Sequence, residues 1–125
     1  MKDEREFFPA AEVEWADDPS SPGVSQRVLS ADGPVFLTRL ARWAPGLDTT
    51  ASGVIRHTYV EEVYLLEGEL TDLTLDQTFT AGSYACRPPG MPHGPYRTTA
   101  GCIMLEIRSR PDESVGPSEP ISPAG

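Results

Sequence analysis

The chain contains only two histidines, His57 and His93, and each lies beside short apolar runs and turn residues. His57 stands shortly before the acidic pair Glu61-Glu62, and His93 follows the turn Pro88-Pro89-Gly90. Histidine is the commonest metal ligand in proteins, and it is the side chain whose charge changes near neutral pH. Such sparing use, with both copies next to strand and turn residues, indicates a site for metal binding or acid–base chemistry.

The first histidine segment predicts which carboxylate accompanies His57. If the chain runs extended from Gly53, side chains alternate between two faces. One face then carries Ile55, His57, Tyr59 and Glu61. Glu62 falls on the other face, and an ionised Glu61 pointing into a barrel is costly unless it is paired or metal-bound. The alternative is an exposed acidic corner, with His57 as a polar residue at a strand end.

The second histidine segment predicts a rigid loop. Pro88-Pro89-Gly90 forces a tight turn, and Pro92 restricts the backbone of Met91 just before His93. A ligand on a loop requires such rigidity. The alternative is a rigid hairpin loop with an exposed histidine.

Short β-rich runs that are separated by turn residues predict an all-β fold. Glycine, proline and aspartate punctuate the chain, and no window has a helical period with caps. The expected strands are Val24–Ser30, Val35–Trp43, Thr50–Tyr59, Glu62–Glu67, Leu70–Leu75, Thr78–Phe79, Tyr84–Arg87, Pro95–Thr98 and Cys102–Arg108. Glu67-Gly68 is interpreted as a turn between two of them. This pattern is typical of a jelly-roll barrel or a sandwich of two antiparallel sheets.

The length of 125 residues fits one domain with a single core. We expect an N-terminal arm over 1–23, a β-barrel over 24–109 and a disordered tail over 110–125, because the tail is rich in proline and has little to bury. Phe7-Phe8 would anchor the arm on the barrel or on a partner chain.

The net charge of −9 argues against nucleic acid and anionic membranes as partners. The charged start of the chain leads into no apolar stretch of signal-peptide length, so we expect a cytoplasmic protein. Cys86 and Cys102 match no zinc or redox spacing and are interpreted as small buried hydrophobic residues.

Together, the two histidine segments resemble the two motifs of the cupin superfamily. In the second motif, Gly82, Pro88, Gly90 and His93 all have the required spacing. In the first motif, the matching residues are His57, Glu61 and Gly68. The resemblance covers roughly residues 35 to 108. The sequence of this region is similar to that of single-domain cupins grouped with the cupin part of zinc-binding anti-sigma factors. It is also similar to that of dioxygenases that cleave β-diketones.

Three positions depart from the motifs: Thr49 replaces a glycine, Ile55 a histidine and Arg97 an asparagine. Because Ile55 replaces one histidine, the residues that still match the ligand positions are His57, Glu61 and His93, and the resemblance implies a metal site formed by these three. Two imidazoles and a carboxylate suit catalytic zinc or the facial triad of non-haem iron. The expected cofactor is one divalent ion, either Fe, Zn, Mn or Ni. The replacement by Ile55 equally allows that the metal has been lost.

The leading hypothesis is a small metal-dependent cupin enzyme that acts on an oxygenated organic molecule, as a dioxygenase, isomerase or cyclase. The candidate catalytic residues around the metal are Tyr96, Tyr59, Glu106 and Arg39. Tyr96 or Glu106 would move a proton, and Arg39 or Arg97 would neutralise an enolate or carboxylate.

Two alternatives stay open. The first is a metal-free cupin in which His57 or His93 is the base and a tyrosine the acid, as in sugar epimerases of the superfamily. The second is a non-catalytic sensor that holds zinc or a ligand. The expected partners are a small-molecule substrate and a second copy of the chain, because cupin barrels often pair through edge strands and N-terminal arms.

The alignment predicts that Ile55→His restores a lost ligand. We expect roughly a tenfold or greater gain in zinc affinity, because a further imidazole would join the site. Competition with a fluorescent chelator measures this affinity. An unchanged affinity would contradict the placement of Ile55 in the ligand position.

Overall fold

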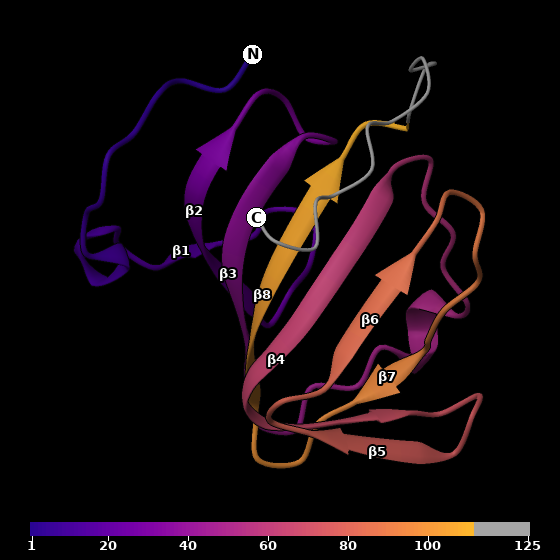
Figure 1. Ribbon diagram of the computed structural model, residues 1–125. Coiled ribbons are helices and arrows are strands. Elements are labelled where there is room, and N and C mark those ends of the chain that lie inside the picture. Colours follow the sequence, from indigo (N-terminus) through magenta and orange to yellow (C-terminus); the bar gives the residue numbers. More distant parts are fainter. Residues whose placement is uncertain (112–125) are drawn as a thin grey trace, which may run out of the picture.

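The computed structural model describes residues 1–111 and is almost entirely β. The predicted disordered tail lies outside the described residues, apart from its first two positions. Two short 3-10 helices accompany the strands (Figure 1): η1 (Ala10–Glu12) and η2 (Thr50–Ser52). The strands are β1 (Ala16–Asp17), β2 (Val24–Ala31), β3 (Leu37–Trp43), β4 (Val60–Asp72), β5 (Gln77–Thr80), β6 (Tyr84–Arg87), β7 (Tyr96–Arg97) and β8 (Cys102–Ser109). The prediction of an all-β protein is confirmed.

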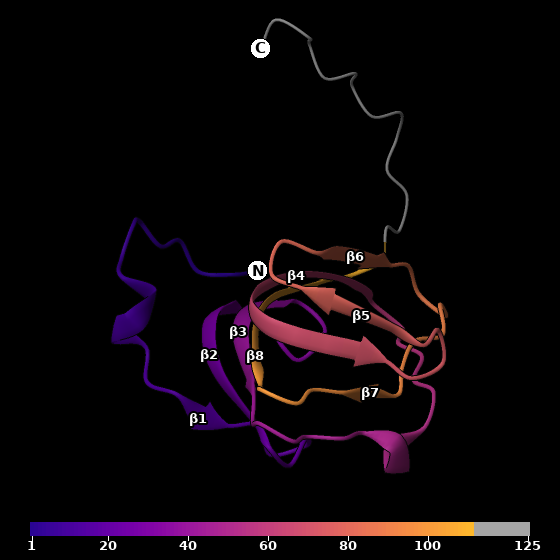
Figure 2. The ribbon, with the colours of Figure 1, turned by 90° about the horizontal axis from the view of Figure 1, so that it is seen from below.

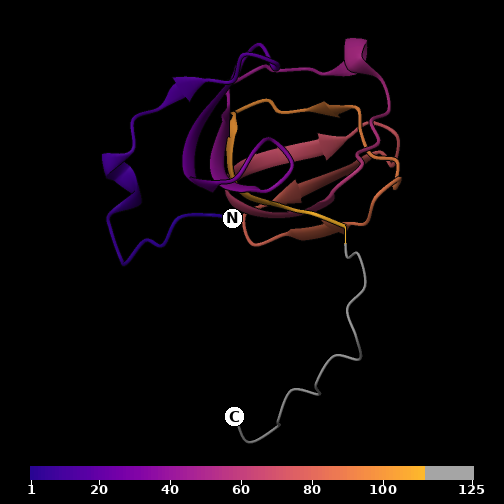
Figure 3. The same cartoon turned by 90° about the horizontal axis from the view of Figure 1, so that it is seen from above.

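All eight strands belong to one antiparallel sheet that curls around an interior. Its main path runs β1-β2-β3-β8-β4-β5, and β6 and β7 also pair with β4. The first part of β4 pairs with β8 and β6, whereas its last residues pair with β5 and β7. Seen from below and above (Figures 2 and 3), β5 and β7 lie across the interior from β3. The curled sheet therefore encloses a space that its inward side chains must fill or line.

Strand β4 corrects the predicted turn at Glu67-Gly68, because the chain continues as one strand of 13 residues. The register with β8 shifts between Leu65 and Glu67, and Gly68 has a φ of +82°. A bulge with a glycine of positive φ bends a strand without ending it. The glycine does change the direction of the chain, but hydrogen bonds to neighbouring strands before and after it keep the segment a single strand.

Residues 50–59 correct a second prediction. They form η2 followed by an irregular segment instead of a strand, and Gly53 has a φ of +64°. The one β-bridge of this segment is the isolated bridge between Ile55 and His93. A segment that pairs with another loop at one point has no ladder to extend it.

The inward rows of the sheet are apolar at one end and charged at the other. The apolar cluster consists of Val63, Leu65, Leu70, Tyr96, Cys102 and Met104, with Trp43 and Phe79 packed against it. Buried positions alternate along β3 and β8, so the same two rows that contribute to the core also carry Arg39 and Glu106 inward. Cys102 is buried as expected, but Cys86 is exposed on β6, which corrects its assignment as a buried residue.

The N-terminal segment loops outward beside the barrel (Figure 1) and β1 adds to the edge of β2. Polar contacts also tie this segment to the sheet: Lys2 Nζ donates to Thr38 Oγ1 at 3.1 Å, and Arg5 Nη1 donates to the carbonyl of Leu29 at 3.0 Å. Phe7 is fully exposed, so it packs on no described part of the chain. The guanidinium of Arg5 lies 4.0 Å from the ring centroid of Phe8. Neither helix formed by residues 1–111 has the length and apolar character needed to cross a membrane.

A buried ion-pair network joins the β1–β2 connection to the sheet through Arg39. Its Nη1 donates to Asp18 Oδ2 at 2.8 Å, and its Nη2 donates to both carboxylate oxygens of Glu106 at 3.2 Å. Although burial alone raises the pKa of Asp18, hydrogen bonds from Arg39 and Ser20 hold that pKa below its ordinary value. Burial raises the pKa of Glu106, and Arg39 offsets part of that rise. The network fixes three segments around one guanidinium.

Replacing Gly68 with alanine tests whether close packing at the bend in β4 requires a glycine. A methyl group there would overlap the carbonyl oxygen of Gly101 and lie 2.8 Å from the Cα of Cys102, whereas Gly33 has nearly the same φ, +81°, with open space around it. We expect Gly33→Ala to cost about 1–2 kcal/mol through its backbone conformation. Gly68→Ala should cost about 1–3 kcal/mol more through overpacking. Urea unfolding followed by tryptophan fluorescence measures both, and equal losses would contradict the clash.

Replacing Arg39 tests how much the ion-pair network contributes to stability. Arg39→Met should lower the free energy of unfolding by about 3–5 kcal/mol, because two buried carboxylates lose their partner. Arg42→Met on the same strand is the control: that side chain is exposed, so we expect a loss below about 1 kcal/mol. Similar losses in the two variants would mean that the network adds nothing beyond a surface contact.

Candidate metal centre

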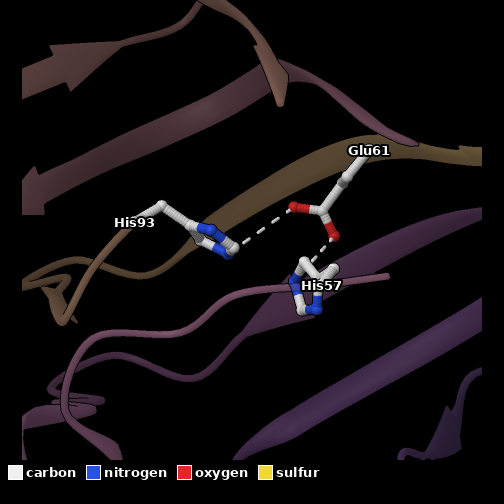
Figure 4. Close-up of side chains that lie close together, drawn as sticks. All are labelled: His57, Glu61 and His93. Carbon is white, nitrogen blue, oxygen red and sulfur yellow. Dashed lines mark ion pairs between the residues drawn. The ribbon is translucent and has the colours of Figure 1, made fainter. Parts of the chain in front are cut away.

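Three side chains from separate segments converge on one point inside the barrel. Glu61 is the second residue of β4, His57 lies in the segment before that strand, and His93 lies in the loop between β6 and β7. Their potential ligand atoms all lie within 4.8 Å of one another. Figure 4 shows each imidazole beside a different oxygen of the Glu61 carboxylate. The Nε2 of His57 lies 3.7 Å from Oε2, and the Nε2 of His93 lies 4.0 Å from Oε1.

Pairing between the two histidine-bearing loops positions both imidazoles. The backbone N–H of Ile55 donates to the carbonyl of His93 at 2.8 Å, and the N–H of His93 donates back at 3.0 Å. The N–H of Gly90 donates to the carbonyl of His57 at 2.9 Å. The proline-glycine turn thus acts through its backbone, by fixing one histidine relative to the other.

Glu61 and Glu62 point to opposite sides of β4, as strand alternation requires. Glu61 is 5% exposed and accepts a 2.7 Å hydrogen bond from Arg87 Nη1. Glu62 lies outside the barrel, where its carboxylate accepts a hydrogen bond from the exposed Tyr84 at 2.6 Å. The face predicted for Glu61 is therefore the inner one.

Burial keeps both imidazoles in the form that binds metals. Desolvation lowers the pKa of His57 and that of His93, and the cation Arg87 lowers both further. A neutral imidazole has the lone pair that a metal requires. The nearby Glu61 acts in the opposite direction on both pKa values without reversing the shift.

The geometry of the three donors fits one metal ion. Metal–ligand bonds of about 2.0–2.2 Å place two ligands of one ion at most about 4.4 Å apart. That limit applies to ligands on opposite sides of the ion, and in a tetrahedral site the ligand atoms lie about 3.4 Å apart. The separations of 3.7 and 4.0 Å between Glu61 and the histidines are close to this value, and the widest separation, at most 4.8 Å, would close by about 1.4 Å on binding an ion. Two imidazoles and a carboxylate are a donor set for zinc or non-haem iron.

Arg87 is a site residue that the sequence analysis missed. It lies directly opposite Glu61 in the pairing of β6 with β4. Besides Glu61, it donates through Nη2 to the hydroxyl of Tyr96 at 2.6 Å. Side chains alternate along β6, so Arg87 lies on the same face as Ala85 and opposite the exposed Tyr84 and Cys86. This alternation was the feature of the sequence that could have indicated an inward Arg87. The pairing of β6 with β4 could not be read from the sequence.

The two predicted tyrosines both lie beside the histidines. Tyr59 stacks on His57 with ring centroids 4.5 Å apart, and burial raises the pKa of its hydroxyl. Tyr96 is 7% exposed, with its ring centroid 6.1 Å from that of His93. Burial raises the pKa of Tyr96 to about 12. Both phenols are therefore protonated at neutral pH.

The predicted charged residues divide into two groups. Arg39 and Glu106 line the same cavity as the triad, but each is bound to the other. Arg97 is exposed on β7 and does not line the cavity of the triad. Arg108 of β8 instead lines the cavity, with its guanidinium 5.2 Å from the ring centroid of Tyr59.

The triad faces a cavity of about 410 Å³. Ile55 lines this cavity, at the position where the motif that the sequence resembles has a histidine. The volume falls within the roughly 300–1,000 Å³ of small-molecule sites. The arrangement can therefore place a small molecule against a bound ion.

Solved structures with the same fold include several cupins. An RmlC-like cupin from Shewanella frigidimarina matches with a TM-score of 0.66 and 20% identity, over 88% of this chain and 95% of that one. An acetylacetone dioxygenase from Acinetobacter johnsonii matches with a TM-score of 0.65 and 16% identity, over 85% and 74%. The complex of SigE with the anti-sigma ChrR from Rhodobacter sphaeroides matches with a TM-score of 0.60 and 24% identity, over 78% of this chain and 50% of that one. These likenesses establish the fold.

No curated protein sequence matches this chain significantly. A family profile described as the ChrR cupin-like domain matches residues 3–109, which is most of the chain. That match covers both histidine segments and every strand of the barrel. The chain therefore belongs to the ChrR cupin-like family.

Proposed function

We propose that this protein is a metal-dependent cupin enzyme that acts on an oxygenated small organic molecule. The observation that carries the proposal is the convergence of His57, Glu61 and His93 at the wall of a cavity large enough for such a molecule. The three residues hold one divalent ion, either zinc, iron, manganese or nickel. The bound ion supplies a Lewis acid or an oxygen-activating centre.

The remaining residues of the cavity supply protons and orientation. Tyr96 accepts a hydrogen bond from Arg87, so its own proton is free to be donated to an oxygen of the ligand. Its pKa of about 12 keeps that proton in place until a basic oxygen is presented. Tyr59 stacks on His57 and limits the rotation of the imidazole. Arg39 and Glu106 hold each other and support the cavity wall.

The contact between Arg87 and Glu61 favours a second candidate, acid–base catalysis without a metal. Arg87 Nη1 already compensates the buried carboxylate at 2.7 Å, as a metal ion otherwise would. In that case a neutral histidine is the base and Tyr96 the acid. Metal analysis of protein purified without chelators separates the candidates, because full activity with no bound metal would exclude the first.

Removing a single ligand tests the metal site. His57→Ala and His93→Ala should each reduce zinc affinity by about 100-fold or more, because only two donors remain. The fold should persist, because the two imidazoles lie in loops at the cavity and not in the apolar cluster. Titration against a zinc indicator measures affinity, and circular dichroism measures the fold. If both variants unfolded, the two histidines would be needed for the fold, and the prediction that they act only as metal ligands would be wrong.

The two neighbouring glutamates provide a matched control. Glu61→Gln removes the charged donor between the imidazoles and should also weaken zinc binding strongly, whereas Glu62→Gln changes a carboxylate on the outer face. We expect the second variant to bind zinc like the unaltered protein. Equal losses in both would mean that the overall acidity of the chain, and not the triad, attracts the ion.

A further inference from the structure

A second cavity lies beside the metal centre and is mostly apolar, although Asp72, Thr74 and Ser83 also line it. Its volume is about 380 Å³, and it extends between β4, β5 and β6. Its inner wall is formed by Val63, Leu65, Leu70, Phe79, Ala85 and Met104. An apolar cavity of this size offers a water molecule few hydrogen-bonding partners and accommodates an apolar molecule well.

The two cavities share a wall that contains part of the candidate site. Arg87, His93 and Tyr96 line both the apolar cavity and the cavity of the triad. A molecule in the apolar cavity would therefore lie next to a potential metal ligand, a guanidinium and a protonated phenol. Apolar walls with a few convergent polar groups are the usual composition of a ligand site.

The rim of the apolar cavity is also apolar. Val54, Leu75 and Met91 are 52%, 59% and 44% exposed, and all three line this cavity. They come from three segments, which include the β4–β5 turn and the loop before His93. These side chains are three of the eight large hydrophobic residues that are exposed among the described residues. Clustered exposure of this kind marks a binding surface.

The charges around the triad favour a ligand that is negative at one end. The cations around the triad are Arg39, Arg87 and Arg108. The carboxylates are Asp48, Glu61 and Glu106 of the cavity lining, together with Asp18, which pairs with Arg39. Three positive charges therefore face four negative ones, and the neutral histidines carry no charge. A divalent ion would leave one positive charge uncompensated in a largely buried place, which is costly. An anionic group of the ligand would reduce that excess.

We propose that the ligand is a small organic anion with an apolar tail, such as a medium-chain monocarboxylate. Its head group lies at the triad beside Arg87, and its tail fills the apolar cavity. The position of the head group rests on the metal-dependent function proposed above, whereas the position of the tail rests on the second cavity alone.

Calorimetric titration of the zinc-loaded full-length chain with straight-chain carboxylates, from butanoate to decanoate, tests the proposal. We expect affinity to rise about threefold to fourfold with each methylene until the cavity is full, because each one buries further apolar surface. Primary alcohols of equal length should bind at least about tenfold more weakly, since they lack the charge. A flat dependence on chain length overturns the tail assignment, and equal binding of alcohols overturns the anionic head.

Two variants localise the tail. Ala85→Phe fills the inner wall, and Leu75→Asp places a charge on the exposed rim, where it costs the fold little. Each should weaken decanoate binding about tenfold or more while butanoate binding changes little. The control is Leu66→Asp, because Leu66 is 41% exposed on β4 and lines neither cavity. Unaltered decanoate binding in both cavity variants would overturn the proposal.

Zinc content, measured by mass spectrometry in every sample, separates this inference from the proposed function. Zinc binding without any effect of chain length would refute the tail assignment and leave the metal centre standing. An effect of chain length in a protein that binds no zinc would refute the metal-dependent function and support the apolar cavity as the binding site.

Discussion

The burial of one carboxyl side chain, Glu61, constrains the interior of this barrel. Glu61 is held away from water at the start of β4, so its charge must be compensated from within the protein. Arg87 provides one partner directly across the strand pair, and the two imidazoles stand at the other sides of the carboxylate. A metal ion would compensate the same charge at closer range. The site is therefore placed where the fold already needs a cation.

The fold meets this need by combining one long strand with two short loops. Strand β4 carries Glu61 inward near its beginning and bends at Gly68, so its later residues wall the opposite side of the interior. The histidines lie on loops, but backbone hydrogen bonds between those loops fix their separation. The second charged group, Arg39 with Asp18 and Glu106, closes the polar end without contributing a ligand. Rigid backbone and paired charges together preorganise the donors.

The interior is divided by chemistry as well as by space. On one side of Arg87, His93 and Tyr96 the walls carry charges and potential ligands, and on the other side they are apolar and reach an apolar rim. The same phenol and guanidinium face both compartments. A ligand that combines an oxygen-bearing group with an apolar part would satisfy both at once, whereas a wholly polar molecule would leave one of them unused.

The sequence by itself indicated the all-β class, most strand positions and the opposite faces of Glu61 and Glu62, because alternation is a local property. The convergence of His57 and His93 in one site was implied only by the resemblance to the cupin motifs. The sequence did not determine that β4 runs through Glu67-Gly68, that residues 50–59 are irregular, or that Arg97 faces outward while Arg87 faces inward. Each of these depends on which strand lies alongside. Only the tertiary structure brings β6 against β4 and thereby sets Arg87 opposite Glu61, since a contact across 26 residues is decided by packing of the whole sheet and not by local preference.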